Sequence, residues 1–564
     1  MKVTNKYDHY AKYAEVTDLL QKYASDFPGY TRLSSLATSK EGREIWLLEI
    51  TDLSTGDFSE KPGYFLNGHV HAGEVSGTMT TLYFLDALFT NLKSDRGVSD
   101  LLKNTTFYVI PRPVVDGAEY YLTTPDTLRS VNEYYPYQED QDGIIPKDLD
   151  GDGVIRTMLV KSPYGVWKKE KDDPRILTRR LPDDIKGVFY NAYMEGLIKG
   201  YKGEEPQPAP AKYGLDLNRN FPYKWETANI QQGSGFYALD RQESRTLAEF
   251  VISHRNICAT INMHTSGRQY LYPPGTFSKK EANQDDMKRY DVISKIAGEE
   301  TGYTPMNIKD DYLADSPGRV TGSFDDFLHF ANGIFSFTIE IWNAGQQAGL
   351  ELGHPDPYDK KTPAEILEMH KKFFAWIDSE GYDKYVKAWT PYNHPQLGEV
   401  EIGGIEPKYF IQNPPFELLE QEVERHTRFI LRHAKMLPHL VFKDAKSEEV
   451  SPGVFRIFAS LYNSGYLPSS ATNEFVTLGL AEDIEVSISA KAKDILQGDK
   501  VQKIGQLEGF SGVRSEIWGF RPFTAKHNPV EKQIEWIVSG KAGDKLTLSA
   551  SSQRAGKAKI KVTL

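Results

Sequence analysis

The stretch that decides the fold is Asn67-Gly68-His69-Val70-His71-Ala72-Gly73-Glu74. The apolar run Tyr64-Phe65-Leu66 precedes it, and apolar residues recur at helical spacing from Val75 onward. This order predicts a turn that ends a buried strand and leads into a helix, with His71 and Glu74 three residues apart on it. An imidazole nitrogen and a carboxylate on such a turn can converge on one point, as the ligands of a catalytic zinc ion do.

The same stretch allows a second interpretation. His69 and His71 could form the ligand pair, with Glu74 as a base. The chain contains 13 histidines, so about one His-x-x-Glu is expected by chance and the pair alone is a weak signal. Other parts of the sequence must decide between these alternatives.

Composition limits the class of protein. A length of 564 residues predicts several domains and more than one core, and 39% hydrophobic residues are typical of a globular protein. The net charge of −11 leaves no basic excess for neutralising phosphates, which argues against nucleic acid as a partner. Cys258 is the only cysteine, so an internal disulfide and a cysteine-rich metal site are excluded.

The beginning of the chain gives a limited indication of location. Residues 1–8 are polar and lack the apolar core of a signal peptide, and no stretch is apolar enough for a membrane span. We therefore expect a soluble protein, either cytoplasmic or, if a leader was removed, secreted or periplasmic.

Strands and helices alternate over residues 1–385. A helix is expected over about Tyr10–Phe27, and a later one opens at the capping box Thr362-Pro363-Ala364-Glu365. The expected strands include Arg43–Ile50, Thr106–Ile110, Ile257–Met263 and Phe335–Trp342. This alternation predicts an α/β domain with a mixed, largely parallel central sheet flanked by helices. In such sheets, functional sites form where the strands end.

Residues from about 126 to 212 interrupt this pattern with polar, proline-rich and charged segments, which indicates a long insertion. Within it, Asp148, Asp150 and Asp152 alternate with other residues and are followed by glycine, as in the first half of a calcium loop. The twelfth position is Leu159 where such a loop has glutamate. A calcium site and a plain Asp/Gly turn both stay open.

Residues 386–564 are expected to form a second unit. Prolines punctuate a linker, and a helix follows over about Glu417–Met436. The rest alternates as strands do, for example at Val454, Arg456 and Phe458. We interpret this part as a C-terminal β-sandwich.

Two further strands carry residues of interest. His264 ends one of them, and Glu340 lies inside the apolar run Phe337–Trp342, where a carboxylate is costly to bury without a partner or a task. Taken alone, His264 could be an ordinary core histidine, and Asn218-Arg219-Asn220 a solvated loop. Their order along the chain makes these explanations less probable.

The chain resembles the zinc carboxypeptidases of the carboxypeptidase A type over about residues 10–380. The matching segments are His71-Ala72-Gly73-Glu74, Met263-His264-Thr265, Leu217-Asn218-Arg219-Asn220, Phe337-Thr338-Ile339-Glu340 and, less well, Pro111–Gly117. The resemblance implies one zinc ion per chain on His71, Glu74 and His264, with His69 as a supporting residue. It also implies Glu340 as general base and then acid, Arg129 as oxyanion stabiliser, and Asn218 and Arg219 as ligands of the substrate's terminal carboxylate.

Two positions depart from the family pattern. The family has a tyrosine on a mobile loop, but Pro317 occupies that position here and the nearest upstream tyrosine is Tyr312. Phe324, just before Asp325, matches a pocket position that is acidic in relatives preferring basic residues. We therefore expect a preference for apolar or aromatic C-terminal residues.

The expected function is zinc-dependent removal of C-terminal residues from peptides with a free terminal carboxylate. One alternative is an amidohydrolase on the same scaffold that acts on cell-wall stem peptides or N-acyl amino acids, because the insertion and the extra β-domain suit a specialised substrate. A peptide-binding module without catalysis is the alternative from another class. Glu340 argues against that module, since binding alone requires no buried base.

Overall fold

The central sheet has the strand order β1-β2-β4-β3-β11-β14-β12-β13 in the computed structural model, which describes the whole chain except residues 315–317, 352–360, 519–520 and 527–528. Its strands are β1 (Thr31–Thr38), β2 (Glu44–Ile50), β3 (Gly63–Asn67), β4 (Thr106–Ile110), β11 (Ile257–Thr265), β12 (Gln269–Tyr272), β13 (Thr304–Asn307) and β14 (Phe335–Ile341). The four central strands β4, β3, β11 and β14 run parallel. Every residue of β3, β4 and β11 is buried, as expected for parallel strands covered on both faces.

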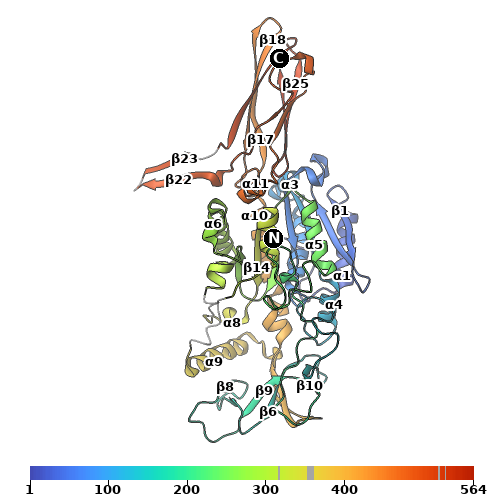
Figure 1. The fold of residues 1–564 in the computed structure, drawn as a ribbon, viewed down its shortest axis with the longest axis vertical. Coiled ribbons are helices and arrows are strands. Elements are labelled where there is room, and N and C mark those ends of the chain that lie inside the picture. The colour runs from blue at the N-terminus through green and yellow to red at the C-terminus, as the bar shows by residue number, and fades with distance from the viewer. Residues whose placement is uncertain (315–317, 352–360, 519–520, 527–528) are drawn as a thin grey trace.

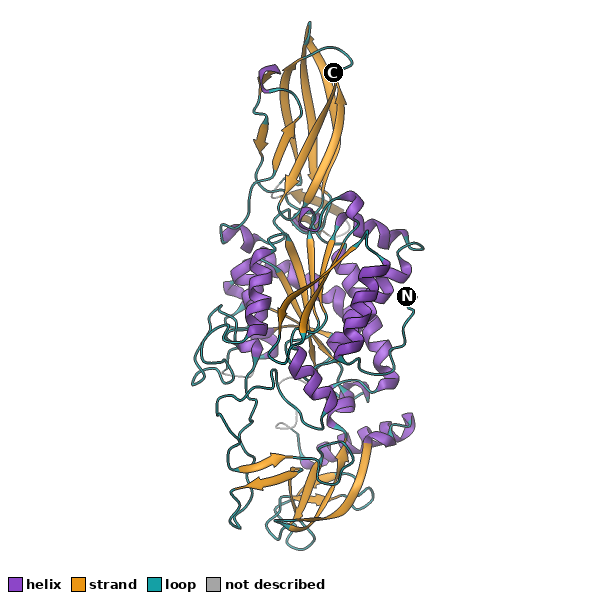
Figure 2. Cartoon of the chain, turned by 90° about the vertical axis from the view of Figure 1, so that its right-hand side faces the viewer, coloured by secondary structure: helices purple, strands orange, loops and turns teal. Residues whose placement is uncertain are grey.

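Helices cover both faces of this sheet (Figure 2). The helices of this part are α1 (Tyr13–Asp26), α2 (Ser76–Asn91), α3 (Arg96–Asn104), α4 (Val115–Thr123), α5 (Gln242–Ser253), α6 (Gln284–Thr301), α7 (Phe324–Asn332), α8 (Ala344–Gln347), α9 (Pro363–Glu380) and α10 (Phe416–Ala434). Helix α9 lies at the insertion end of the molecule and not on the sheet (Figure 1). The expected mixed, largely parallel α/β sheet is thereby confirmed. Helix α10 packs against α2 and α6, and its buried face belongs to the same apolar core as α2.

The insertion forms a separate layer at one end of the molecule (Figure 1). A two-stranded ribbon joins β5 (Gly143–Pro146) to β10 (Gly196–Lys199). A six-stranded sheet has the order β15-β16-β6-β9-β7-β8, with β6 (Thr157–Lys161), β7 (Trp167–Lys169), β8 (Leu177–Arg179), β9 (Tyr190–Met194), β15 (Val386–His394) and β16 (Gly398–Ile405).

Residues 386–405 were expected to be a linker, and this expectation is wrong. They form the hairpin β15–β16, and β16 pairs with β6 of the insertion in antiparallel register. Pro391 pointed away from a strand, but it lies in β15, which is an edge strand of the sheet. An edge strand tolerates proline because one row of its backbone N–H groups needs no partner.

The C-terminal part contains two four-stranded sheets at the opposite end of the molecule (Figure 1). One has the order β17-β18-β24-β20 and the other β21-β19-β25-β26. The bounds are α11 (Asn473–Thr477), β17 (Leu440–Ser451), β18 (Val454–Asn463), β19 (Glu485–Ile488), β20 (Ile495–Gln497), β21 (Val501–Lys503), β24 (Glu531–Ser539), β25 (Lys545–Ser552) and β26 (Gly556–Thr563). Both sheets contribute to one apolar core, so this part is a β-sandwich, and the hairpin of β22 (Val513–Trp518) and β23 (Arg521–Lys526) projects from it.

Arg554 fastens the sandwich to the α/β part. It is 2% exposed, and its guanidinium donates hydrogen bonds to the main-chain oxygens of Arg255, Asn332 and Gly333. The same guanidinium lies 3.4 Å from the centroid of the Phe475 ring. Arg255 lies just before β11, and Asn332 and Gly333 lie at the end of α7 just before β14, so the sandwich is attached next to the strands that carry the candidate site.

Candidate functional site

The candidate site lies where three neighbouring parallel strands end. His71 and Glu74 follow β3, His264 is the penultimate residue of β11, and Glu340 is the penultimate residue of β14. His264 and Glu340 are partners in the β11–β14 register, so both side chains lie on the same face of the sheet. The sheet order therefore brings together residues that are far apart in the sequence.

Two glycines allow the turn after β3 to pack this closely. A Cβ atom at Gly68 would lie 1.8 Å from the main-chain oxygen of Pro111. A Cβ atom at Gly77 would lie 1.6 Å from the main-chain oxygen of Gly68. Any side chain at either position would push the turn away from β4 or α2, and the ligand residues would move with it.

The nitrogen and oxygen atoms of the three candidate ligands converge. Oε2 of Glu74 lies 3.0 Å from Nδ1 of His71 and 2.9 Å from Nδ1 of His264. The two Nδ1 atoms are 3.0 Å apart. All three side chains are buried, and Oε2 of Glu74 has no hydrogen-bond partner among the described residues.

This arrangement suits a divalent cation. Nε2 of His71 lies 3.0 Å from the carboxylate oxygen Oδ1 of Asp216, so its proton belongs on Nε2 and Nδ1 presents a lone pair. That lone pair and the Glu74 oxygen then face one point, where a cation relieves their repulsion. Two histidines and one glutamate form a donor set that catalytic zinc uses, and a carboxylate behind a ligating histidine is usual.

His69 does not join this cluster. Its Nδ1 lies 2.8 Å from the main-chain oxygen of His71, and its Nε2 lies 3.0 Å from Oγ1 of Thr78. Both ring nitrogens are thus used within the turn. Burial lowers the pKa of His69 to about 3, which keeps the ring neutral.

Arg129 bridges the two carboxylates around His71. It donates from Nη1 to Oε1 of Glu74 at 3.0 Å and from Nε to Oδ2 of Asp216 at 3.1 Å. Burial opposes ionisation of Asp216, but Arg129 and His71 outweigh it and hold the pKa of Asp216 well below its usual range. Asp216 was not predicted as a site residue, although it directly precedes the matching segment Leu217–Asn220.

Glu340 is only partly buried, yet its environment favours the neutral acid. The pKa of Glu340 is raised to about 7, mainly by loss of hydration and also by Glu74, while His264 and Arg129 act in the opposite direction. A carboxyl group that titrates near neutral pH can accept a proton and return it.

Asn218 and Arg219 lie in a short 3₁₀ turn, Leu217–Arg219, which Asp216 caps by accepting a hydrogen bond from the Asn218 N–H at 2.9 Å. Oδ1 of Asn218 accepts a hydrogen bond from the Phe324 N–H at 2.8 Å. The Phe324 ring is 1% exposed and stacks on Phe221 with 4.3 Å between ring centroids. Phe324 therefore belongs to the core around α7, and its role in a side-chain pocket stays a prediction.

Tyr312 lies near the site, which counting along the sequence did not reveal. Burial raises the pKa of Tyr312, and Glu340 raises it further, whereas Arg219 and Arg129 lower it. The phenol is therefore within electrostatic reach of these three groups. Pro317, the position that matches the family's tyrosine, lies outside the described residues.

The structure gives no support for a calcium site in the insertion. Nζ of Lys387 lies 2.6 Å from Asp150 and 2.7 Å from Asp152, so an ammonium group already neutralises these carboxylates. Asp148 accepts hydrogen bonds from the N–H groups of Gly151 and Gly153, as in an Asp/Gly turn. The plain turn is the better description of this loop.

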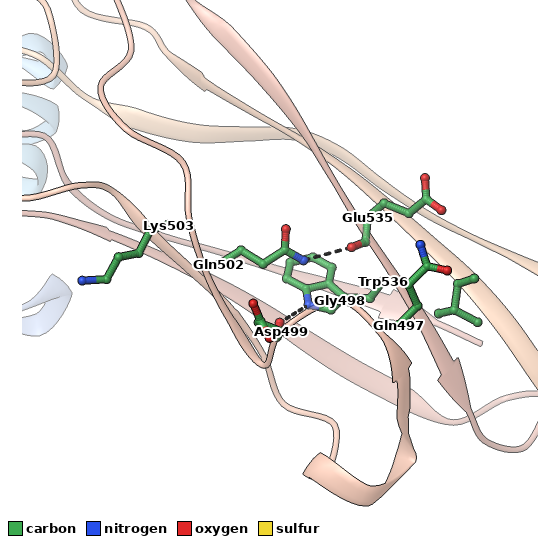
Figure 3. A pocket seen from close by; sticks show the side chains of 8 residues that line it. Gln497, Gly498, Asp499, Gln502, Lys503, Glu535 and Trp536 are labelled. Atoms are coloured by element: carbon green, nitrogen blue, oxygen red, sulfur yellow. Dashed lines mark hydrogen bonds between the residues drawn. The ribbon is translucent and has the colours of Figure 1, made fainter.

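A hollow in the C-terminal sandwich offers no comparable chemistry (Figure 3). The indole N–H of Trp536 donates to the main-chain oxygen of Asp499, and Gln502 donates to that of Glu535. Its polar side chains are thus used to fix the loop between β20 and β21.

No helix in the described part of the chain has the length and apolarity for crossing a membrane.

Comparisons with known proteins agree with this geometry. A family model described as zinc carboxypeptidase matches residues 16–354, and a model for a domain of unknown function matches residues 439–563. Carboxypeptidase B of Astacus astacus is 32% identical over 351 residues, covering 60% of this chain and 87% of that protein. Human carboxypeptidase D is 32% identical over 111 residues, which are 20% of this chain and only 8% of that protein.

The solved structures to which the chain is similar are more distant in sequence. Thrombin-activatable fibrinolysis inhibitor is 17% identical, with a TM-score of 0.39 over 66% of this chain and 75% of that one. Carboxypeptidase A from Helicoverpa armigera is 17% identical, with a TM-score of 0.38 over 67% and 74%.

Proposed function

Because the chain belongs to the zinc carboxypeptidase family, we propose that it is a zinc-dependent exopeptidase that hydrolyses the C-terminal bond of peptides. The observation that carries this proposal is the convergence of His71, Glu74 and His264 within 3.0 Å of one another, on the sheet edge that also holds Glu340. These donors would hold one zinc ion per chain. When bound, the ion acts as a Lewis acid on water and on the scissile carbonyl.

Glu340 supplies the proton transfers. Its carboxylate removes a proton from the attacking water and then returns it to the leaving amine, as general base and then acid. A pKa near neutral suits both steps, because the group changes protonation state at little cost. A peptide-binding module without catalysis would require no such carboxyl group beside the donors.

Arg129 has two tasks in this proposal. Its hydrogen bonds from Nη1 to Glu74 and from Nε to Asp216 hold a ligand residue and the carboxylate behind His71 in place. Nη2 lies outside these two hydrogen bonds and can donate to the oxygen of the scissile carbonyl as negative charge develops there.

Arg219 and Asn218 bind the terminal carboxylate of the substrate. The Arg219 guanidinium lies near Asp216 and Tyr312, because its charge lowers the pKa of both groups. A second cation beside a metal site is best explained by an anion that arrives with the substrate. A guanidinium can bind a carboxylate through two parallel hydrogen bonds.

The test of exopeptidase specificity is one peptide series prepared as free acids and as C-terminal amides, ending in Phe, Leu, Lys or Glu. Amidation removes the partner of Arg219 and leaves the guanidinium unpaired, at a cost on the order of 2–5 kcal/mol. We expect kcat/KM to fall more than about tenfold for each amide. Equal cleavage of acids and amides would overturn the role of Arg219, and a clear preference for Lys would overturn the role of Phe324 alone.

Replacement of Glu340 tests the chemistry separately from binding. In Glu340→Gln the amide cannot accept the proton of water, so kcat should fall about a hundred- to ten-thousand-fold. Zinc content and thermal stability should stay at wild-type levels, because Glu340 is not one of the converging donors. A variant with near-normal kcat would remove Glu340 from the mechanism.

A further inference from the structure

An open cavity of about 590 Å³ begins beside the candidate active site and is bordered by the insertion. On the active-site side it is lined by Ser266, two residues after His264, and by Asn343, three residues after Glu340. Asn218 and Arg219 are not among the residues that line it, so it does not overlap the proposed carboxylate site. Its volume is within the range of roughly 300–1,000 Å³ that is usual for ligand pockets.

The outer walls come from parts of the chain that surround the core of the α/β domain. Trp167 and Leu177 belong to β7 and β8 of the insertion. Phe373 and Phe374 lie on α9, and Trp389 lies on β15, all beyond the residues 16–354 that match the family. The cavity is therefore lined mainly by the insertion and by residues beyond the family match.

The lining favours a bulky apolar group. Four aromatic rings line the cavity, and no Asp or Glu is among the described residues that do so. Arg175 is the only guanidinium among the described lining residues, and Asp173 and Asp378 each bind it at 2.7 Å. It also lies 4.9 Å from the centroid of the Phe374 ring. This cation is thus already paired and serves to fasten α9 to the insertion.

We propose that this cavity binds an aromatic or large aliphatic side chain of the peptide substrate upstream of the scissile bond. The inference rests on the proposed exopeptidase function. If the terminal carboxylate is at Arg219 and the scissile bond is near Glu340, only the upstream part of a peptide can enter the cavity. The insertion then acts as a selector for peptides with a bulky apolar residue before the residue that is removed.

The test uses N-acetylated tetrapeptide acids that share a C-terminal Phe. Each of the three upstream positions is in turn Trp, Phe, Leu, Ala, Lys or Glu, and an N-acetylated Ala-Phe acid serves as the short reference. At one upstream position, we expect wild-type kcat/KM to be about ten- to a hundredfold higher with Trp, Phe or Leu than with Ala, Lys or Glu.

Two variants change the cavity in opposite directions. Trp389→Ala removes part of the cavity wall, and Leu177→Trp fills the cavity. In both variants, kcat/KM for peptides with Trp, Phe or Leu should differ by less than about threefold from kcat/KM for peptides with Ala, Lys or Glu. Cleavage of the short reference should stay near the wild-type value, which also shows that the variants are folded. Tyr164→Ala is the matched control, because Tyr164 is an aromatic residue of the insertion that is 87% exposed and outside the cavity lining.

A neighbouring cavity of about 820 Å³, on the Arg129 side of β9, provides a second control. Ile145 lines that cavity, and Ile145→Trp should leave the upstream preference unchanged. A preference that survives both Trp389→Ala and Leu177→Trp, or that is lost in Ile145→Trp, would overturn the proposal. Failure of wild type to cleave the short reference would instead refute the exopeptidase function itself, so the two failures are distinguishable.

Discussion

Two clusters of three side chains in this molecule could each surround a cation, and they differ in how their charges are satisfied. His71, Glu74 and His264 form one, and Asp148, Asp150 and Glu195 form the other. In the first, Oε2 of Glu74 is buried and has no hydrogen-bond partner among the described residues. In the second, Asp148 and Glu195 accept hydrogen bonds from backbone N–H groups, and Lys387 pairs with Asp150.

The difference shows that proximity of donor atoms is a weak indication of a metal site. Buried polar atoms normally find partners within the protein, so a buried Glu74 oxygen without one, facing two histidine nitrogens, indicates a position for a ligand. The acidic cluster of the insertion is already balanced by Lys387 and by backbone N–H groups, so it has less need of a metal ion.

The largest expected effect comes from removing a donor from the first cluster. His264→Ala should abolish both stoichiometric zinc and peptidase activity, because two protein ligands rarely retain catalytic zinc. Asp150→Asn in the second cluster should change neither. Elemental analysis of both variants is the measurement, and full zinc in the double variant His71→Ala/His264→Ala would refute the first assignment.

The residue behind His71 should have the next largest effect. Asp216→Asn removes the negative charge that orients His71 and pairs with Arg129, so zinc affinity should fall about ten- to a hundredfold. Activity should return when excess zinc is supplied, which separates a positioning role from a role in the reaction. Asp148→Asn is the parallel change in the acidic cluster, and an equal loss of zinc there would contradict the comparison.

A buried histidine outside both clusters makes the comparison sharper. His433 accepts or donates one hydrogen bond at Nδ1, to the Tyr64 hydroxyl, and burial lowers its pKa to about 3. Since the unfolded chain binds a proton near pH 6.5, the stability that neutral His433 contributes is complete above this pH and is lost as pH falls toward 3. Between pH 7 and pH 5 the loss should be about 2 kcal/mol in the free energy of unfolding.

The variant His433→Gln removes this titration and leaves a side-chain acceptor for Tyr64. Denaturant unfolding at pH 7 and pH 5 should therefore show a smaller pH dependence in the variant than in wild type. Identical pH dependence in the two proteins would show that His433 is already protonated in the folded state. Nε2 of His433 has no hydrogen-bond partner among the residues that the structure describes, and such a nitrogen is compatible with a purely structural role when no described donor converges on it.

The smallest expected effect concerns Lys387. Lys387→Met leaves Asp150 and Asp152 without their ammonium partner, which should lower stability by about 1 kcal/mol because all three side chains are only partly buried. Lys161→Met is the matched control, because its pair with Glu399 is largely exposed and should contribute nothing measurable. Added calcium should leave the wild-type Tm unchanged, and a clear rise in Tm would break the comparison.

The central part of this site was predictable from the sequence, because the ends of buried strands can be recognised in it. His71 and Glu74 follow an apolar run, and Glu340 interrupts another, so both positions carry a local signal. Asp216 has no such signal, since its task depends on Arg129 and His71 from other elements. Tyr312 was not assigned because counting selects Pro317, and its nearness to the site depends on Glu340, Arg219 and Arg129 from other elements.

Long-range pairing explains the other misses. Lys387 pairs with Asp150 and Asp152, more than two hundred residues earlier, and no local sequence pattern predicts such a contact. The hairpin β15–β16 resembled a linker because it contains prolines and polar residues. Such residues are tolerated at the edge of a sheet, and the sequence does not show that this segment lies at an edge. The fold class was predictable from alternation, whereas the partners of the insertion were not.

The pairing of β6 with β16 also sets the order in which the molecule can be completed. Val160 pairs with Val400, so the insertion sheet lacks this partner strand until the ribosome has made nearly all of the α/β domain. Contacts between such distant segments form slowly, because the entropy cost of closing a long loop comes before the contacts stabilise the fold. A chain that stopped before residue 386 would leave β6 as an exposed edge, and such edges promote aggregation.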